Sequence, residues 1–368
     1  MIGAGIQQNW PPDDGASCIP RARKTCAKIK ALHAVLPLHR ARDRLFNSQT
    51  RRQYLALYLV TGGAGFIGSH MVEELLRRGD SVRVLDNLST GHIENLASVR
   101  GKIDFHQADI RDHEAIRPLF AGVDYVIHLA ALASVPRSME DPVETTLVNI
   151  NGTLHVLLAA REASVKRVVM AVTCAAYGDN PALPSVETQL PQPLSPYALS
   201  KLADEYYGQI FNRYFGLEAV SLRFFNIFGP RQDPASPYSG VLSLFIAGYF
   251  RGGTPTIFGD GEQSRDFTYV SNVVDATLLA CRSATAPGKV INVGTGISST
   301  LNRTIALLNT ILGVQVTPSY AAPRPGDIRD STADISLARA TLGYEPNVSF
   351  EDGLRRTIEW MRAAQVTA

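Results

Sequence analysis

The chain has 368 residues, of which 45% are hydrophobic, and a formal net charge of +2. This length is sufficient for one large α/β domain, or for a large and a small domain that share a cleft. Residues 1–52 contain ten Lys or Arg against three acidic residues, so the rest of the chain carries about −5. The basic character therefore belongs to an N-terminal arm and gives no reason to predict a nucleic-acid-binding domain.

The N-terminal arm, residues 1–53, mixes Pro, Cys and Arg without a hydrophobic period, which predicts an irregular extension. An organelle-type presequence, a nucleic-acid-binding tail and an extension without function remain open, and the composition favours the last. No long apolar stretch precedes Tyr54, and the four cysteines and eight histidines show neither a disulfide framework nor metal-ligand spacing. We expect a cytoplasmic protein without a metal and without a membrane or nucleic-acid partner.

From Leu55 onward, short apolar runs alternate with longer helical patterns, which is typical of a doubly wound, mainly parallel seven-stranded sheet with helices on both faces. The first helix is expected to begin at Phe66 and to end at Gly79, with Val72, Leu75 and Leu76 on its buried face. Strands are predicted near residues 56–60, 81–85, 103–106, 124–128, 167–172, 218–222 and 289–293.

A glycine-rich run lies between the first predicted strand and the first helix, with Gly62, Gly65 and Gly68 in the spacing G-x-x-G-x-x-G. A dinucleotide fold needs a tight turn here, close approach of the backbone to a pyrophosphate, and a helix packed closely on the strand. A side chain at the glycine positions would obstruct the turn, the approach of the backbone and the packing of the helix. In this context, the run predicts a Rossmann-type dinucleotide site.

Asp86 ends the second predicted strand, 18 residues after Gly68, where a carboxylate can accept both ribose hydroxyls of an adenosine. The same carboxylate would repel a 2′-phosphate, so the sequence favours NAD over NADP; a solvated loop aspartate is the alternative. Asp109 and Ile110 follow the third strand and are expected to flank the adenine. Residues 129–131 follow the fourth strand and are expected beside the nicotinamide half.

Ser195 and Pro196 predict the N-cap and first residue of a helix, which puts Tyr197 and Lys201 at positions i and i+4 on one face. An ammonium and an oxidised nicotinamide near a phenol each favour the phenolate by about 1 to 4 kcal/mol, roughly enough to bring its pKa near neutrality. Thr173 closes the fifth strand at the same sheet edge. We predict Tyr197, Lys201 and Thr173 as catalytic; the alternative for Thr173 is a buried hydroxyl bonded only to backbone.

The predicted NAD-binding residues are therefore Gly62, Gly65, Phe66, Ile67, Gly68, Asp86, Asn87, Asp109, Ile110, Leu129, Ala130, Ala131, Tyr197 and Lys201. Three segments rich in Pro, Gly and polar residues interrupt the strand–helix pattern: 181–194, 231–265 and 296–368. We expect them to form a smaller α/β substrate-binding lobe over the carboxyl ends of the strands. Residues 54–230 with 266–295 would form the NAD-binding domain.

Several motifs together resemble the extended short-chain dehydrogenase/reductases, the NAD-dependent epimerase/dehydratase family, and most of all the UDP-N-acetylglucosamine type of UDP-sugar 4-epimerase. They are the glycine-rich run, Asp86, residues 128–131, Thr173 with Tyr177 and Gly178, Tyr197 with Lys201, and residues 223–226. The resemblance covers residues 54–362. It implies a tightly held NAD, a UDP-hexose substrate, a homodimer built through the helix that bears Tyr197, and Phe225 beside the nicotinamide.

The same resemblance implies a substrate site. Asn226 is expected near the diphosphate, Arg265 and Arg324 at phosphate oxygens, and Asp327 at the uridine ribose. Ser331 stands where epimerases restricted to small sugars carry a bulky Tyr, so a roomier pocket is expected. The full predicted set for the substrate is Ala133, Ser134, Thr173, Asn226, Gln232, Arg265, Arg324, Asp327 and Ser331.

Ala133 and Gln232 stand where glucose-type enzymes resemble one another in carrying charged side chains, which favours a substrate with an acetamido group. The expected reaction is therefore interconversion of UDP-N-acetylglucosamine and UDP-N-acetylgalactosamine through a 4-keto intermediate, with UDP-glucose and UDP-galactose as further candidates. Thr173-Cys174-Ala175 departs from the run of serines in many relatives, so we expect slower chemistry at worst and not its absence.

The sequence bears on three alternatives to this reaction. A nucleotide-sugar 4,6-dehydratase characteristically has an acid pair directly after the threonine, which Cys174 and Ala175 cannot supply. A UDP-glucuronate 4-epimerase or decarboxylase remains open, because arginines near the cleft could accept a carboxylate. An inactive NAD-binding regulator also remains open, because the segment Thr173-Cys174-Ala175 has fewer hydroxyl groups than the run of serines in many relatives and because the N-terminal arm is basic.

Overall fold

The computed structural model describes residues 55–233, 240–323 and 328–366. The N-terminal arm and two predicted substrate residues, Arg324 and Asp327, lie outside these ranges. Within them, the main sheet has seven parallel strands: β1 (Leu57–Thr61), β2 (Ser81–Asp86), β3 (Asp104–Gln107), β4 (Tyr125–His128), β5 (Arg167–Thr173), β6 (Glu218–Phe224) and β11 (Val290–Val293). The predicted fold class is confirmed, since these strands lie at the expected places.

The order of strands in the main sheet is β11-β6-β5-β4-β1-β2-β3. The chain therefore builds outward from β1 to β3 and then returns to place β4 on the other side of β1. At such a switch point the connections leave in opposite directions, and the carboxyl ends of β1 and β4 border an open crevice. The glycine-rich run follows β1, and residues 129–131 follow β4.

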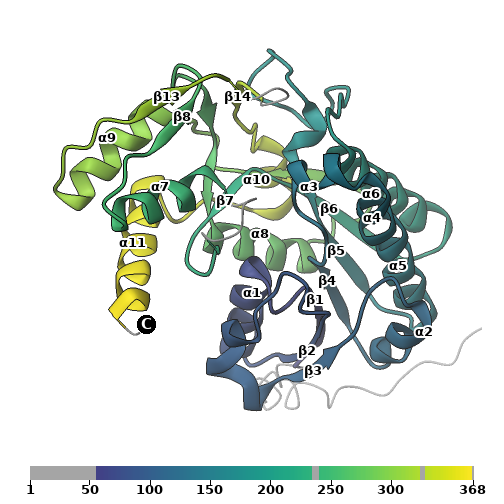
Figure 1. The fold of residues 1–368 in the computed structure, drawn as a ribbon. Coiled ribbons are helices and arrows are strands. Elements are labelled where there is room, and N and C mark those ends of the chain that lie inside the picture. Colours follow the sequence, from purple (N-terminus) through teal and green to yellow (C-terminus); the bar gives the residue numbers. More distant parts are fainter. Residues whose placement is uncertain (1–54, 234–239, 324–327, 367–368) are drawn as a thin grey trace, which may run out of the picture. The chain divides into compact units, whose positions relative to one another are not determined.

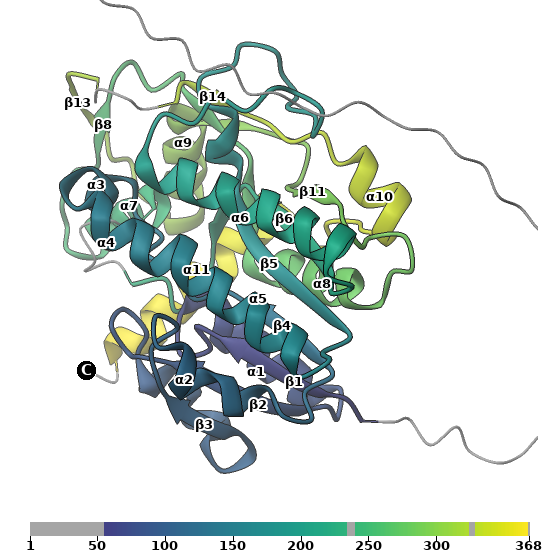
Figure 2. The ribbon, with the colours of Figure 1, turned by 90° about the vertical axis from the view of Figure 1, so that its right-hand side faces the viewer.

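Helices cover both faces of the main sheet (Figures 1 and 2). The helices and helical turns are α1 (Phe66–Arg77), η1 (Ile93–Lys102), α2 (His113–Ile116), η2 (Arg117–Phe120), α3 (Val135–Glu140), α4 (Pro142–Thr146), η3 (Leu147–Asn151), α5 (Gly152–Glu162), η4 (Cys174–Tyr177), α6 (Pro196–Tyr214), α7 (Val241–Phe250), α8 (Val270–Arg282), α9 (Leu301–Leu312), α10 (Ser336–Leu342) and α11 (Phe350–Val366). Side chains of α1, α8 and α10 join one core cluster with the sheet. Those of α2, α5 and α6 join another on the opposite face.

Two helix starts confirm predictions made from local sequence. Gly65 precedes α1, and this helix ends at Arg77 before Gly79, whose φ of +87° suits glycine. The Ser195 hydroxyl caps α6 by accepting from the Ala198 backbone N–H (3.1 Å), and Pro196 occupies the first helical position. This cap fixes the direction in which Tyr197 leaves the helix.

A separate hydrophobic cluster holds together α7, α9 and α11, which lie together to one side of the main sheet in Figure 1. Small sheets accompany them: β7 (Asn226–Phe228) with β10 (Phe267–Tyr269), β8 (Thr256–Phe258) with β13 (Ser319–Ala321), and β9 (Ser264–Arg265) between β12 (Ser299–Thr300) and β14 (Asp330–Ser331). Ala338, Leu342 and Tyr344, from the predicted lobe segment 296–368, instead pack in the core of the main sheet. No helix among the described residues is both long and apolar enough to cross a membrane.

Candidate active site

A cavity of about 510 Å³ opens at the carboxyl ends of the central strands. It is lined by most of the predicted cofactor and substrate residues: Gly62, Gly65, Phe66, Ile67, Gly68, Asp86, Asn87, Asp109, Ile110, Leu129, Ala130, Ala131, Ala133, Thr173, Tyr197, Lys201, Phe225, Asn226 and Gln232. Among the predicted substrate residues that the structure describes, three do not line this cavity: Ser134, Arg265 and Ser331. One continuous space therefore joins the predicted dinucleotide-binding residues to the predicted catalytic residues, which we call the chemical end of the cavity.

The glycine turn leaves the N-terminus of α1 open to the cavity. Gly62 has a φ of +70°, and a Cβ added at Gly68 would lie 2.1 Å from the carbonyl oxygen of Gly62. The turn is closed by the Gly65 N–H, which donates to that oxygen (3.1 Å). Backbone N–H groups at the start of a helix bind anions, so this turn fits the pyrophosphate of a dinucleotide.

Asp86 is held at the end of β2 by two backbone donors. Its carboxylate accepts from the N–H of Ala64 (2.9 Å) and from that of Leu88 (2.8 Å). Burial raises the pKa of Asp86, and the two backbone hydrogen bonds act against this rise by favouring the charged form. The carboxylate therefore has a fixed orientation on the cavity wall, which fits the predicted contact with ribose hydroxyls.

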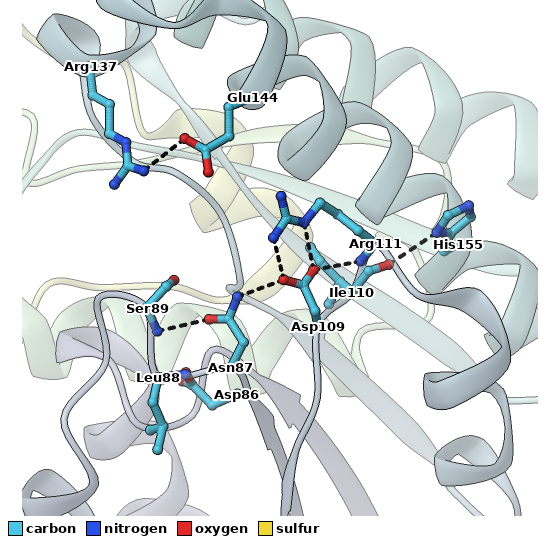
Figure 3. Close-up of polar contacts among 10 residues, drawn as sticks. All are labelled: Asp86, Asn87, Leu88, Ser89, Asp109, Ile110, Arg111, Arg137, Glu144 and His155. Carbon is cyan, nitrogen blue, oxygen red and sulfur yellow. Dashed lines mark hydrogen bonds and ion pairs between the residues drawn. The ribbon is translucent and has the colours of Figure 1, made fainter.

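Asp109 lies in a chain of polar contacts that no sequence motif predicts (Figure 3). Its carboxylate accepts from Arg111 Nη2 (2.7 Å) and Nε (3.0 Å), and from Asn87 Nδ2 (2.9 Å). The Arg111 guanidinium, followed by the other donors, lowers the pKa of Asp109 to about 2. Arg111 stands only two residues after Asp109, so its spacing was the available signal.

All three basic side chains that line the cavity within the described residues are paired with carboxylates. Besides Arg111 with Asp109, Arg137 Nη2 contacts Glu144 Oε2 at 2.8 Å (Figure 3). Lys201 Nζ contacts Asp204 Oδ2 at 3.2 Å. Because these charges are already compensated, the cavity wall suits a dinucleotide without an additional 2′-phosphate.

Tyr197 and Thr173 lie together at the chemical end. The Thr173 hydroxyl hydrogen-bonds to Tyr197 and accepts from the Ala175 N–H (3.2 Å). Burial raises the pKa of Tyr197 to about 12, against the smaller lowering by Thr173. The spacing of Tyr197 and Lys201 predicts that Lys201 lowers this pKa, but the Lys201 ammonium is paired with Asp204, whose charge acts in the opposite direction. In the chain alone, Tyr197 is therefore a neutral phenol at pH 7.

The remaining predicted substrate residues have other partners. Ser134 caps α3 by accepting from the Arg137 N–H (3.1 Å), and Ser331 accepts from Asn226 Nδ2 (3.1 Å). Arg265 Nη1 donates to the carbonyl oxygens of Ser264 and Arg329, both at 2.8 Å. Ser331 thus acts on the cavity through Asn226, whose amide it orients.

The sequence model of the NAD dependent epimerase/dehydratase family matches residues 58–294. The chain belongs to this family. The family is described as NAD dependent, and the open glycine turn, Asp86 and the paired cations fit that cofactor. The prediction of NAD is confirmed.

Proteins similar to this family member include a UDP-glucose 4-epimerase from Mycolicibacterium smegmatis, which is 39% identical over 83% of this chain and 98% of its own. A solved UDP-glucose 4-epimerase from Thermotoga maritima, with UDP-glucose, is 42% identical, with a TM-score of 0.80 over 84% of this chain and 99% of that one. The UDP-N-acetylglucosamine 4-epimerase from Methanobrevibacter ruminantium M1, in complex with UDP-N-acetylmuramic acid, is 39% identical, with a TM-score of 0.81 over the same shares.

Proposed function

We propose that this chain is an NAD-dependent UDP-hexose 4-epimerase that interconverts UDP-N-acetylglucosamine and UDP-N-acetylgalactosamine. One observation carries the proposal: a single cavity is lined by the glycine turn and Asp86 and also by Tyr197, Thr173 and Lys201. A dinucleotide held by the first group would extend toward the second. The similarity to UDP-sugar 4-epimerases over most of the chain supports the same reaction class.

NAD would be held by the backbone of the glycine turn, by Asp86 at the adenosine ribose, and by residues 129–131 and Phe225 along the other half. When bound, it supplies a reversible acceptor for the hydride from C4 of the hexose and, in oxidised form, a positive charge. Since burial opposes ionisation of Tyr197, this added charge is needed for the side chain to act as a base near neutral pH.

Tyr197 then takes the proton of the 4-hydroxyl group as C4 is oxidised, and returns it when C4 is reduced again. The Thr173 hydroxyl, already hydrogen-bonded to Tyr197, orients the phenol oxygen and shares the proton. The 4-keto sugar turns about its diphosphate link between the two transfers, so it presents its other face. Asn226, with its amide oriented by Ser331, would hold the diphosphate during this turn.

The sugar end favours an uncharged hexose. Ala133, Cys174 and Gln232 line it without a charge that an acetamido group would have to desolvate. A glucuronate carboxylate would need a cation, yet the described basic side chains that line the cavity are already paired. For the 4,6-dehydratase alternative, Cys174 and Ala175 still supply no acid pair.

We also propose a homodimer built through α6. Leu199, Tyr206, Ile210 and Tyr214 are exposed apolar residues at spacings of seven, four and four, so they form one stripe along this helix. Val143 and Leu147, on the neighbouring α4 and η3, are exposed as well. An apolar surface that runs over adjacent helices is typical of a protein–protein contact.

The test incubates the purified chain separately with UDP-N-acetylglucosamine, UDP-glucose and UDP-glucuronate, without added cofactor, and resolves the products by chromatography. We expect UDP-N-acetylgalactosamine from the first. The variant Tyr197→Phe should remain folded, and its turnover rate should be about 10² to 10⁴ times lower than that of the parent, because it lacks the hydroxyl that transfers the proton. Conversion of UDP-glucuronate alone, or full turnover by Tyr197→Phe, would contradict the proposal.

A further inference from the structure

Asp204 is a buried carboxylate that the proposed mechanism does not use. It stands on α6 three residues after Lys201, and its exposed fraction is only 1% against 3% for Lys201. Its Oδ2 atom lies 3.2 Å from Lys201 Nζ. Burial of such a pair costs desolvation free energy that the mutual attraction repays only in part, so stability alone is a weak reason for its presence.

A line of hydrogen bonds leads to Asp204 from the cavity wall. Thr61 Oγ1 accepts from the N–H groups of Leu129 and Ala130, both at 3.2 Å, and contacts His128 Nδ1 at 2.7 Å. His128 Nε2 in turn contacts Thr153 Oγ1 at 2.9 Å.

The direction of these bonds follows from donor and acceptor counts. Burial, with a further effect of Lys201, lowers the pKa of His128 to about 3, so its ring is neutral and carries one N–H. Thr61 already accepts twice, so its hydroxyl hydrogen goes to Nδ1, and Nε2 then donates to Thr153. The Thr153 hydroxyl is left to act on Asp204, and it favours the charged carboxylate.

We propose that Asp204 is a positioning residue: its carboxylate holds the Lys201 ammonium against the cavity wall and compensates the positive charge that Tyr197 and the bound dinucleotide meet. The inference rests on the proposed function for the role of Tyr197 and on the family cofactor for the ligand. Three observations support it: the pair is buried, Lys201 lines the cavity, and the hydrogen bonds from β1 through β4 lead to Thr153 on α5, whose hydroxyl favours the charged carboxylate.

The charge of Asp204 should affect the relative affinity of the chain for NAD and NADH. Oxidised nicotinamide carries a positive charge, and its reduced form does not. If Asp204 is neutralised, Lys201 becomes an uncompensated cation, which disfavours NAD more than NADH. A unit charge several ångströms away in a partly buried site changes the relative affinity by about threefold or more. A residue that only stabilises the fold would weaken both forms alike.

The experiment equilibrates the purified chain with mixtures of NAD and NADH, removes free nucleotide, and reads the bound ratio from NADH fluorescence and total nucleotide absorbance. We expect Asp204→Asn to shift the bound ratio toward NADH by at least about threefold. Asp204→Glu, which keeps the charge, should stay near the parent ratio. Asp275→Asn on α8, a half-buried carboxylate outside the cavity lining, is the matched control and should not change it.

A second measurement needs no variant. Burial raises the pKa of Asp204 to about 6, against the lowering by Lys201 and Thr153, and Glu205 adds to the rise. Lys201, Glu205, Tyr197 and the neutral His128 are the titratable groups around it. The unaltered chain should therefore show the same shift toward NADH as the pH falls from about 8 to about 5.

A ratio that stays constant in Asp204→Asn and across this pH range would overturn the proposal, as would equal weakening of NAD and NADH. If Asp204→Asn does not fold, the pH series on the unaltered chain decides. No sugar is present in either measurement, so a failure of the proposed epimerase activity would leave this result readable by itself.

Discussion

At the scale of single residues, pairing and burial decide what each side chain of the cavity can do. Tyr197 is neutral in the chain alone because burial outweighs the hydrogen bond from Thr173. Lys201 is compensated by Asp204. The residues predicted from the sequence to bind the cofactor or to act in catalysis therefore line one cavity, and their ionisation depends on neighbours that no motif contains.

Asp109 gives a prediction about pH. Its pKa is lowered in the folded chain to about 2 from 3.8, first by Arg111, so its charge stabilises the fold above about pH 4. This contribution is lost as the pH falls through about 2. Asp109→Asn should thus be less stable than the parent near neutral pH, and the difference should shrink between about pH 4 and about pH 2 in urea unfolding followed by circular dichroism.

The exposed Glu359, on α11, offers a control for that measurement. Glu359→Gln should leave the unfolding free energy within about 0.5 kcal/mol of the parent at each pH, since it changes a surface group only. A difference between Asp109→Asn and the parent that is independent of pH would rule out the charge-based explanation.

At the scale of elements, the turn between β1 and α1 has little room for a side chain. A Cβ at Gly68 would meet three backbone atoms of residues 62 and 63, at 2.1, 2.7 and 2.8 Å, and backbone cannot rotate away as a side chain can. We expect Gly68→Ala to lower the unfolding free energy by about 1 to 3 kcal/mol and to weaken NAD binding, because the turn must open.

Gly101→Ala is the matched substitution, since a Cβ there would meet no atom within 4 Å. It should change the unfolding free energy by no more than about 0.5 kcal/mol and leave NAD binding intact. Both variants can be compared by thermal unfolding with and without NAD. Equal behaviour of the two alanine variants would show that the turn does not require glycine at position 68.

The elements of the main sheet could be predicted because each strand is a buried apolar run and each helix has a local cap, as Ser195 does for α6. The small sheets could not, because strands such as β9 and β14 have two residues and no period to detect. The Asn226–Ser331 contact joins residues 105 positions apart. The ion pair between Lys201 and Asp204 could not be predicted for another reason: in the sequence, a buried i,i+3 pair of opposite charges looks the same as a pair on a solvated helix face.

At the scale of the whole molecule, the apolar stripe on α6 lies on the helix that also carries Tyr197 and Lys201. A second copy packed on this stripe would hold the catalytic helix from outside while β5 and β6 hold it from inside. Assembly and catalysis would then be linked through one element, although the reacting groups lie within one chain.

Ile210→Glu tests the dimer. A carboxylate in the middle of the stripe would be buried without a partner, so the sedimenting mass should fall to that of a monomer. Ser336→Glu, on α10 and away from the stripe, should leave the mass unchanged. A parent chain that sediments as a monomer at micromolar concentration would contradict the proposed homodimer.

The central claim is that the hydrogen removed from C4 of the hexose returns to the same carbon within one site. It is tested most directly with UDP-N-acetylglucosamine that carries deuterium at C4, incubated with the purified chain in ordinary water without added cofactor. The account predicts UDP-N-acetylgalactosamine that retains deuterium at C4, as read by mass spectrometry and NMR. Product with hydrogen from the solvent at that carbon would contradict it.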